Sequence, residues 1–205
     1  MKILFLNGPP GSGKDYAGKL ISALIPHAHV TKFAKVLKER THGLYGVSSG
    51  PGGGPAPHDW FESRKDEPAP EFFGLTPREA YIGVSETYMK PTHGEDIFGK
   101  LLLQELTSPK VQGSPIAVIT DSGFAEEAAT LVHHFTPEQC FMLHIKRRGC
   151  TFDGDSRGFV DLRDLAVPTT DIWNTGNSDF MEDIILTLGH WLPLRYERQR
   201  LPRYL

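Results

Sequence analysis

Short, unbroken hydrophobic runs along the chain indicate buried strands. Residues 3–6 and 116–120 are the clearest of these runs, and turn-forming or charged residues bound both. Continuous runs of this length are typical of strands that are covered on both faces, as in a parallel sheet. We expect three further strands, at residues 30–33, 141–146 and 171–173.

Between these runs, hydrophobic residues recur every three to four positions, the spacing of a helix with one buried face. This spacing predicts helices over residues 15–25, 34–45, 94–106, 124–134 and 179–188. Another helix begins at Thr76, where a Thr cap, a proline in the first turn and Glu79 form a capping box. We expect it to run to about residue 88, before a break at Pro91. Strands that alternate with helices predict an α/β fold with a mainly parallel sheet.

Two segments lack any such period. Residues 46–74 contain much of the chain's glycine and proline, and we expect a long loop there. Its second half, residues 60–73, carries aromatic and charged residues that a plain linker lacks. Residues 195–205 form a basic tail.

Composition narrows the class of protein. A chain of 205 residues suits one domain, and a net charge of −3 gives no sign of stable nucleic-acid binding. Cys140 and Cys150 lack the spacing of a zinc site or a disulfide framework, so we expect two buried free thiols. The hydrophobic start of the chain is too short for a signal peptide or a membrane span. We therefore expect a cytoplasmic protein that does not enter membranes.

The segment Gly8-Pro9-Pro10-Gly11-Ser12-Gly13-Lys14 has the spacing of a phosphate-binding loop. It follows a predicted strand and opens a predicted helix, the context in which a glycine pattern acquires this meaning. Glycines let successive N–H groups converge on an oxyanion, and the helix N-terminus adds partial positive charge. The lysine can then reach the β- and γ-phosphates of a nucleotide.

Asp15 stands where such loops normally carry a hydroxyl. An acid in the first turn of a helix gains about 0.3–1 kcal/mol from the helix dipole alone. A triphosphate at the same helix end would repel it by about 4 kcal/mol at 4 Å and an effective dielectric near 20. A cation between the two negative charges would make the net interaction energy favourable. Asp15 is therefore either a simple helix-terminal acid or a ligand of Mg²⁺, direct or through water.

Two other charged features have two interpretations each. Asp121 ends the predicted strand 116–120, and it either caps the following helix or supplies a second carboxylate to the metal. Arg147, Arg148 and Arg157 follow the strand 141–146. They form either a solvated charged segment or a set of forked donors for phosphate oxygens.

The chain resembles the bacteriophage deoxynucleoside monophosphate kinases, phosphate-loop enzymes related to adenylate and thymidylate kinases. The resemblance extends from KILFLNGPPGSGKD through FAKVLKERTHGLYG, TPREAYIGVSETYMKPTHGEDIFGKLL, IAVITDSGFAEEA and IKRRG to IWNTGNSDFMEDI. The Gly-Lys-Asp ending of the loop is its most specific part. The resemblance implies a three-layer phosphate-loop sandwich in one domain. It also implies a helical monophosphate-binding insert at about residues 34–106 and a short lid at about residues 147–164.

The same resemblance implies transfer of a phosphoryl group from ATP, with Mg²⁺, to a deoxynucleoside monophosphate. Catalytic roles are implied for Lys14, Arg147 and Arg157. Binding of ATP is implied for Gly8, Gly11, Ser12, Gly13, Lys14, Asp15, Tyr16, Asn174 and Gly176. Metal binding is implied for Asp15 and Asp121. Binding of the acceptor is implied for Phe33, Lys38, Arg78, Tyr81, Glu86 and Tyr88.

The chain departs from related kinases at one point. They often have Asp-x-Arg-Phe after the central strand, whereas this chain has Asp121-Ser122-Gly123-Phe124, so an arginine contact is missing or supplied elsewhere. Other interpretations are a kinase for a modified pyrimidine nucleotide or for a base in phage DNA, and a nucleotide-binding module without chemistry. The expected partners are small nucleotides and, in a homodimer, a second copy of the chain.

Overall fold

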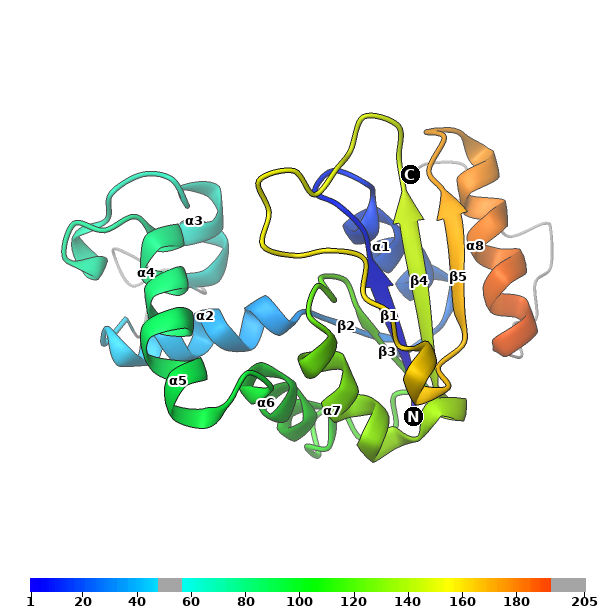
Figure 1. Cartoon of the computed structure of the whole chain (residues 1–205), viewed down its shortest axis with the longest axis horizontal. Helices are drawn as coiled ribbons and strands as arrows, with labels where there is room; N and C mark the ends of the chain where they lie inside the picture. Colours follow the sequence, from blue (N-terminus) through cyan, green and yellow to red (C-terminus); the bar gives the residue numbers. More distant parts are fainter. Residues whose placement is uncertain (48–56, 193–205) are drawn as a thin grey trace.

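The computed structural model describes residues 1–47 and 57–192, and its centre is a five-stranded, fully parallel sheet. The strands are β1 (Lys2–Asn7), β2 (His29–Thr31), β3 (Ile116–Ile119), β4 (Cys140–Lys146) and β5 (Thr169–Trp173). Their order is β2-β3-β1-β4-β5 (Figure 1). Because β1 pairs with both β3 and β4, it is the central strand, and its carboxyl end leads into the glycine-rich loop.

Helices cover both faces of this sheet. Side chains alternate along β1, so Leu4 and Leu6 pack with α1 (Lys14–Leu24) and α8 (Ser178–Trp191). Ile3 and Phe5 pack on the other face with α6 (Ile97–Leu106) and α7 (Ala125–Phe135). All four strand residues are fully buried. The result is a three-layer α/β sandwich around a parallel sheet, as the sequence predicts (Figure 1).

A helical insert connects β2 to β3, and its outer part stands away from the sheet (Figure 1). Its elements before α6 are α2 (Phe33–Leu44), α3 (Pro57–Ser63), a 3₁₀ turn (Pro70–Phe72), α4 (Pro77–Gly83), a π-helix (Val84–Met89) and α5 (Lys90–His93). The outer part has a small core of its own, formed by Phe61, Ala69, Phe72, Ala80 and Tyr81. A cavity can therefore form between this insert and the sheet.

The long loop predicted for residues 46–74 is wrong over the part that the structure describes. Helix α3 and the 3₁₀ turn lie within it, and Phe61 and Phe72 are fully buried. Their partners include Tyr81 of α4, so each short element is stabilised by distant contacts rather than by a periodic pattern. Residues 48–56, most of the Gly/Pro-rich insert, lie outside the described residues, and so does the basic tail.

The predicted helix break at Pro91 is also wrong. Helix α4 continues through the π-helix into α5, which ends at His93, and α6 begins at Ile97 rather than at residue 94. In the π-helix the Lys90 N–H donates to Ser85 O, five residues earlier. This wider turn relieves the clash that a proline ring makes with the carbonyl one turn before it. The capping box at Thr76 and Glu79 is present as predicted.

Two smaller expectations can be compared with the described residues. Cys140 and Cys150 are both free thiols, but only Cys140 is buried; Cys150 is partly exposed. Over residues 1–47 and 57–192, none of the helices combines the length and the hydrophobicity needed to cross a membrane.

Candidate active site

A cavity of about 650 Å³ lies where the carboxyl end of the sheet meets the helical insert. In open α/β sheets, ligands bind in the crevice at this edge. Its cationic side chains are Lys14, Lys32, Lys38, Lys65, Arg78, Lys90 and Arg157, and its acidic ones are Asp15, Glu62, Glu86, Asp121, Glu127 and Asp155. Such a mixture suits an anionic ligand that also carries polar, uncharged groups.

Close backbone contacts shape the glycine-rich loop between β1 and α1. Gly11 and Gly13 have φ values of +77° and +105°, in the left-handed region that favours glycine. A Cβ atom on Gly8 would lie 2.2 Å from the carbonyl oxygen of Ile145, so this position has no room for a side chain. The loop ends at the first turn of α1, whose N–H groups and partial positive charge suit an anion.

Lys14 is the first residue of α1, and its side chain crosses back over the loop. Its Nζ donates to the carbonyl oxygens of Gly8 and Pro9, the latter at 2.8 Å. Burial, and after it repulsion by Arg157, holds the pKa of Lys14 below its usual value. A phosphate bound here would be attracted to both cations at once.

Asn174, in the turn after β5, braces the loop from the side. Its Nδ2 donates to Ser12 O at 2.8 Å, and its Oδ1 accepts from Gly176 N at 3.0 Å. A Cβ atom on Gly13 would lie 2.3 Å from this Nδ2, which explains the glycine. Ser12 itself is buried, and its N–H donates to Pro9 O. These residues fix the shape of the loop whether or not they also contact a nucleotide.

Tyr16 lies beside this brace, on the outer side of α1. Its ring stacks on Phe180 with 6.3 Å between centroids, and the residue is 43% exposed. Phe180 also lies next to Gly13, 3.7 Å from the position of a Cβ atom there. The loop therefore has an exposed aromatic surface at its side.

The Asp15 side chain is 66% exposed and already has a cation beside it. Its Oδ1 accepts from Thr120 Oγ1 at 2.9 Å and pairs with Lys32 Nζ at 2.8 Å. Burial alone would raise the pKa of Asp15, but the hydrogen bond and charge of Lys32, with help from Thr120, hold it below its usual value. Because both contacts use Oδ1, the second oxygen is open to a metal ion. Among the described residues, no three His, Cys, Asp or Glu side chains gather as a metal cluster.

Asp121 holds the start of α2. Its two carboxylate oxygens accept from the N–H groups of Phe33 and Ala34, each at 2.8 Å. These are the first N–H groups of the helix, so Asp121 acts as a cap supplied by a distant segment. The sequence suggests a cap for the helix that follows, whereas the capped helix precedes Asp121 in the chain. With both oxygens engaged in this way, the structure does not support a direct metal contact by Asp121.

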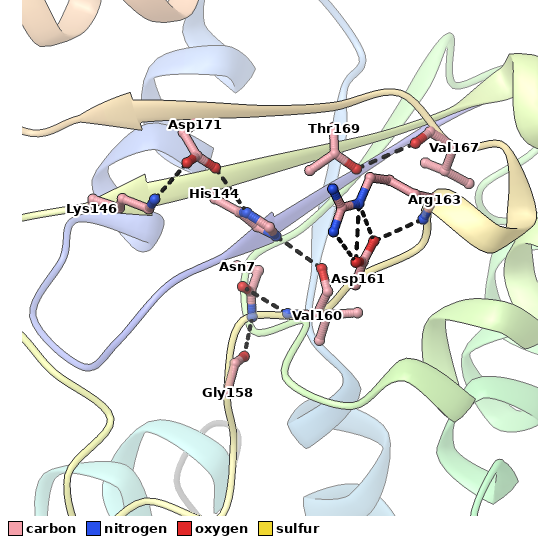
Figure 2. A network of polar contacts seen from close by, with 10 residues as sticks. All are labelled: Asn7, His144, Lys146, Gly158, Val160, Asp161, Arg163, Val167, Thr169 and Asp171. Carbon is pink, nitrogen blue, oxygen red and sulfur yellow. Dashed lines mark hydrogen bonds and ion pairs between the residues drawn. The ribbon is translucent and has the colours of Figure 1, made fainter.

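The loop after β4 returns to the sheet through a buried polar network (Figure 2). Asn7 is 1% exposed; its Nδ2 donates to the carbonyl oxygens of Ser122 and Gly158, and its Oδ1 accepts from Val160 N at 3.3 Å. His144 Nε2 lies 2.9 Å from Val160 O. Residues 158–160 are thus fixed to β1, to β4 and to the segment after β3.

Arg157 enters the cavity just before this anchored segment. Its Nε and Nη2 donate to the two oxygens of Asp155 at 2.8 and 2.6 Å, and Arg157 lowers the pKa of Asp155 to about 2. Its Nη1 makes no hydrogen bond within the described residues. The side chain crosses Gly123, where a Cβ atom would lie 2.4 Å from Arg157 Cδ. Arg157 thus fills the space beside the position that carries arginine in the Asp-x-Arg-Phe pattern.

Arg147, at the other end of the same loop, reaches the glycine-rich loop. Its Nη1 donates to Gly11 O at 3.2 Å. Cys150 Sγ also lies close to this position, 3.5 Å from a Cβ atom built on Gly11. Arg147 and Arg148 are both exposed, and neither lines the cavity. The solvated interpretation fits Arg148, whereas Arg147 is tied to the glycine-rich loop by its bond to Gly11.

Most of the predicted acceptor residues line the cavity: Phe33, Lys38, Arg78, Tyr81 and Glu86. Their charged groups already have partners. Lys38 pairs with Glu62, and Arg78 Nε donates to Asp66 Oδ1 at 2.6 Å. An acceptor phosphate would have to compete with these acids for the cations.

Tyr81 and Tyr88 line different cavities. Tyr81 lines the cavity but is 7% exposed, and its hydroxyl group bonds to His42 Nε2 at 2.9 Å. Burial, with the charge of Glu62, raises the pKa of Tyr81 to about 12. The structure does not bring Tyr88 to this cavity: it lines a separate space of about 430 Å³ beside Leu44.

Several cavity residues do not stand out in the sequence. Lys32 falls within a predicted strand, and Lys90 lies beside the predicted helix break. Glu127 follows Glu126 in an ordinary helical pattern, yet Glu127 is buried and Glu126 is exposed. For Glu127, helical phase relative to Phe124 and Leu131 is the signal that distinguishes the two acids.

No protein-family profile and no curated protein matches the sequence. Among solved structures, an unliganded sugar kinase from Janibacter sp. HTCC2649 is similar, with a TM-score of 0.46 and 11% sequence identity. The similarity covers 95% of this chain and 96% of that chain. We therefore interpret the site from its own geometry.

Proposed function

We propose that this protein is a kinase that transfers the γ-phosphate of ATP to a deoxynucleoside monophosphate, giving the diphosphate and ADP. The observation that supports this best is a single cavity that joins Lys14 and Arg157 to the cations of the insert, Lys38 and Arg78. A triphosphate on the loop and an acceptor phosphate on the insert would share this space. Direct transfer between them needs that proximity.

Position and charge are sufficient for the reaction. The transferring phosphoryl group carries negative charge on its outer oxygens, so cations fixed around it lower the barrier. Two carbonyl oxygens hold Lys14 over the loop. Asp155 holds Arg157 through Nε and Nη2, so Nη1 can still donate to a phosphate. We assign charge stabilisation to these two residues. Arg147 donates a hydrogen bond to Gly11 O. We assign to it the role of closing the loop after β4 over the ATP phosphates.

We propose that ATP lies along the first turn of α1, with its base near Tyr16 and the turn of Asn174 and Gly176. The exposed ring of Tyr16 supports this placement. Arg147 and Arg157 come from one loop, which is anchored at residues 158–160 by Asn7. This arrangement supports a lid that excludes water, without which a kinase would hydrolyse ATP.

Asp15 is the proposed ligand of Mg²⁺, because its Oδ2 is open and its Oδ1 is held by Thr120 and Lys32. The ion would neutralise phosphate charge. Asp121 contributes charge nearby rather than a ligand. We expect Asp15→Asn to raise the Mg²⁺ concentration for half-maximal rate about tenfold or more. Asp179→Asn, on the exposed first turn of α8, is the matched control; unchanged Mg²⁺ dependence in Asp15→Asn would refute the assignment.

The proposed function is tested by ADP formation with ATP, Mg²⁺ and a panel of acceptors. The panel contains natural and modified nucleoside monophosphates in ribo and deoxy forms. We expect ADP only when a suitable monophosphate is present. ATP consumption that is indifferent to every acceptor would overturn the proposal. Salt-sensitive DNA binding would instead favour an acceptor within DNA.

A further inference from the structure

A row of polar side chains crosses three neighbouring strands of the sheet (Figure 2). Asn7 of β1, His144 of β4 and Asp171 of β5 stand opposite one another in the strand register. His144 is the middle of the row, and its side chain is 12% exposed. Its ring lies against Phe159, with 5.1 Å between centroids. The row therefore supports the segment that follows Arg157 in the loop after β4.

Both ring nitrogens of His144 face hydrogen-bond acceptors. Nδ1 lies 3.0 Å from Asp171 Oδ1, and Nε2 lies 2.9 Å from the main-chain oxygen of Val160. A carbonyl oxygen can only accept. The hydrogen bond from Lys146 holds the pKa of Asp171 below its usual value, so this carboxylate also only accepts. A neutral imidazole carries one N–H and an imidazolium carries two, so the two contacts together require the protonated ring.

The charged groups around His144 come from both neighbouring strands and from the loop. They are Asp171 on β5, Lys146 on β4 itself and, in the loop after β4, Asp161 with Arg163. Each of the two acids also has a cation beside it, since Lys146 pairs with Asp171 and Arg163 pairs with Asp161. The direct contacts of the ring with Asp171 and Val160 therefore distinguish its two protonation states.

Loss of one proton from the ring would release Val160 rather than Asp171. A hydrogen bond to a carboxylate is charge-assisted and about twice as strong as one between neutral groups. The neutral ring therefore keeps its proton on Nδ1, and Nε2 then turns a lone pair toward Val160 O. Val160 keeps the bond of 3.3 Å from its N–H to Asn7 Oδ1 but loses its anchor on β4.

Val160 lies three residues after Arg157, to which we assign charge stabilisation. Arg157 is held by Asp155 of the same loop, so the pair moves with the loop. Its place in the cavity depends on where the loop is tied to the sheet. Building on the kinase function above, we propose that His144 is a positioning residue: its protonated ring ties Val160 to β4 and so holds Arg157 in the cavity, and deprotonation loosens the loop.

The first test is amide hydrogen exchange of residues 158–160, which does not depend on turnover. Protection factors correct for the intrinsic effect of pH on exchange. Because histidine changes charge near neutral pH, the anchor should be present at about pH 6 and lost by about pH 8.5. A hydrogen bond from a charged donor is strong enough that we expect protection in the native protein to fall about tenfold over this range.

Asp171→Asn gives the sharpest discrimination. Its amide can donate to a neutral Nδ1, so Nε2 keeps its proton for Val160 O at both pH values, and protection should not change with pH. In His144→Phe the ring remains without a donor, and protection should be low at both pH values. His190→Phe, at an exposed position of α8, is the control and should behave like the native protein. Thermal unfolding at both pH values verifies that each variant is folded.

The second test connects the anchor to the reaction. If His144 positions Arg157, kcat of the native protein should fall about tenfold together with protection. Asp171→Asn should remove this part of the pH profile, whereas KM for ATP should change little in either protein. A kcat that does not follow protection would overturn the positioning of Arg157.

The outcomes separate this inference from the kinase proposal. Native protection that does not change with pH, or an Asp171→Asn loop that loses protection as the native loop does, overturns the inference and leaves the kinase proposal standing if ADP forms. Protection that follows the protonation of His144 without any ADP formation supports the anchor and contradicts the kinase.

Discussion

The two ends of the cavity are held together in different ways. At the glycine-rich loop, side chains bind backbone carbonyl oxygens: Lys14 those of Gly8 and Pro9, and Asn174 that of Ser12. At the insert, side chains bind one another, as Lys38 and Glu62 do. The loop end is therefore shaped before any ligand binds, whereas at the insert end the proposed acceptor would have to replace internal ion pairs. We therefore expect substitutions at the glycine-rich loop to reduce activity strongly and substitutions at the insert to reduce it less.

The largest effect is expected from Lys14→Ala. In the proposed reaction Lys14 stabilises charge on the transferring phosphate, so its loss should lower kcat about a thousandfold. Lys19→Ala, on the exposed side of the same helix, is the matched control and should leave the rate unchanged. Steady-state kinetics with saturating ATP and acceptor measure both variants. A Lys14→Ala enzyme within tenfold of the native rate would contradict the assignment.

A single methyl group at Gly123 should have the next largest effect. The Cβ atom of Gly123→Ala would lie 2.4 Å from Arg157 Cδ and would displace that side chain. We expect kcat to fall about a hundredfold. The unfolding temperature should fall as well, because Arg157 Cγ and Cβ would also lie only 2.6 and 3.1 Å from the new atom. Gly158→Ala is the control, since nothing lies within 4 Å of its Cβ position. Equal rates in the two variants would show that Arg157 has no part in transfer.

A change at the insert end should affect the acceptor alone. Lys38→Met removes a cation that Glu62 already partly neutralises, so we expect KM for the monophosphate to rise only about tenfold. KM for ATP should not change. Arg64→Met, a cation that packs over Trp60 and does not line the cavity, is the control. An equal rise in both KM values for Lys38→Met would refute the division between the two ends.

The smallest effect concerns the joint between the insert and the sheet. Glu105 of α6 accepts hydrogen bonds from His29 of β2 and Lys35 of α2. Burial alone would raise the pKa of Glu105, but hydrogen bonds from His29 and Lys35 lower it to about 2. Because the pKa of Glu105 is lower in the folded state, its ionised form stabilises the fold at pH values above the unfolded-state pKa near 4.5. This stabilisation is lost as the pH falls toward the folded-state pKa of about 2.

Glu105→Gln should therefore cost about 1–3 kcal/mol of stability at pH 7, and the difference from the native protein should disappear near pH 2. Denaturant unfolding across this pH range measures the change. Glu182→Gln, on the exposed side of α8, serves as control. A difference that does not depend on pH would refute the role of the charge.

The same contrast explains what the sequence could predict. Consecutive residues build the loop end, so Gly8 to Asp15 could be identified from spacing alone. The α/β fold with its parallel sheet followed from alternating strands and helices. The insert depends on distant partners: Phe61 and Phe72 become buried only against α4, and no local period marks them. Asp121 was recognised as important, yet its task at α2 depends on a contact 88 residues away in sequence. Helical phase separates Glu127 from Glu126 in the sequence, but the place of Glu127 in a cavity wall depends on how α6 and α7 pack together.

Transfer of radiolabel from the γ-phosphate of ATP tests the central claim most directly. With native protein, Mg²⁺ and a deoxynucleoside monophosphate panel, we expect label in a nucleoside diphosphate and none in free phosphate. Label that appears only in free phosphate, or that stays in ATP with every acceptor, would contradict the proposal that the cavity binds both nucleotides for direct transfer.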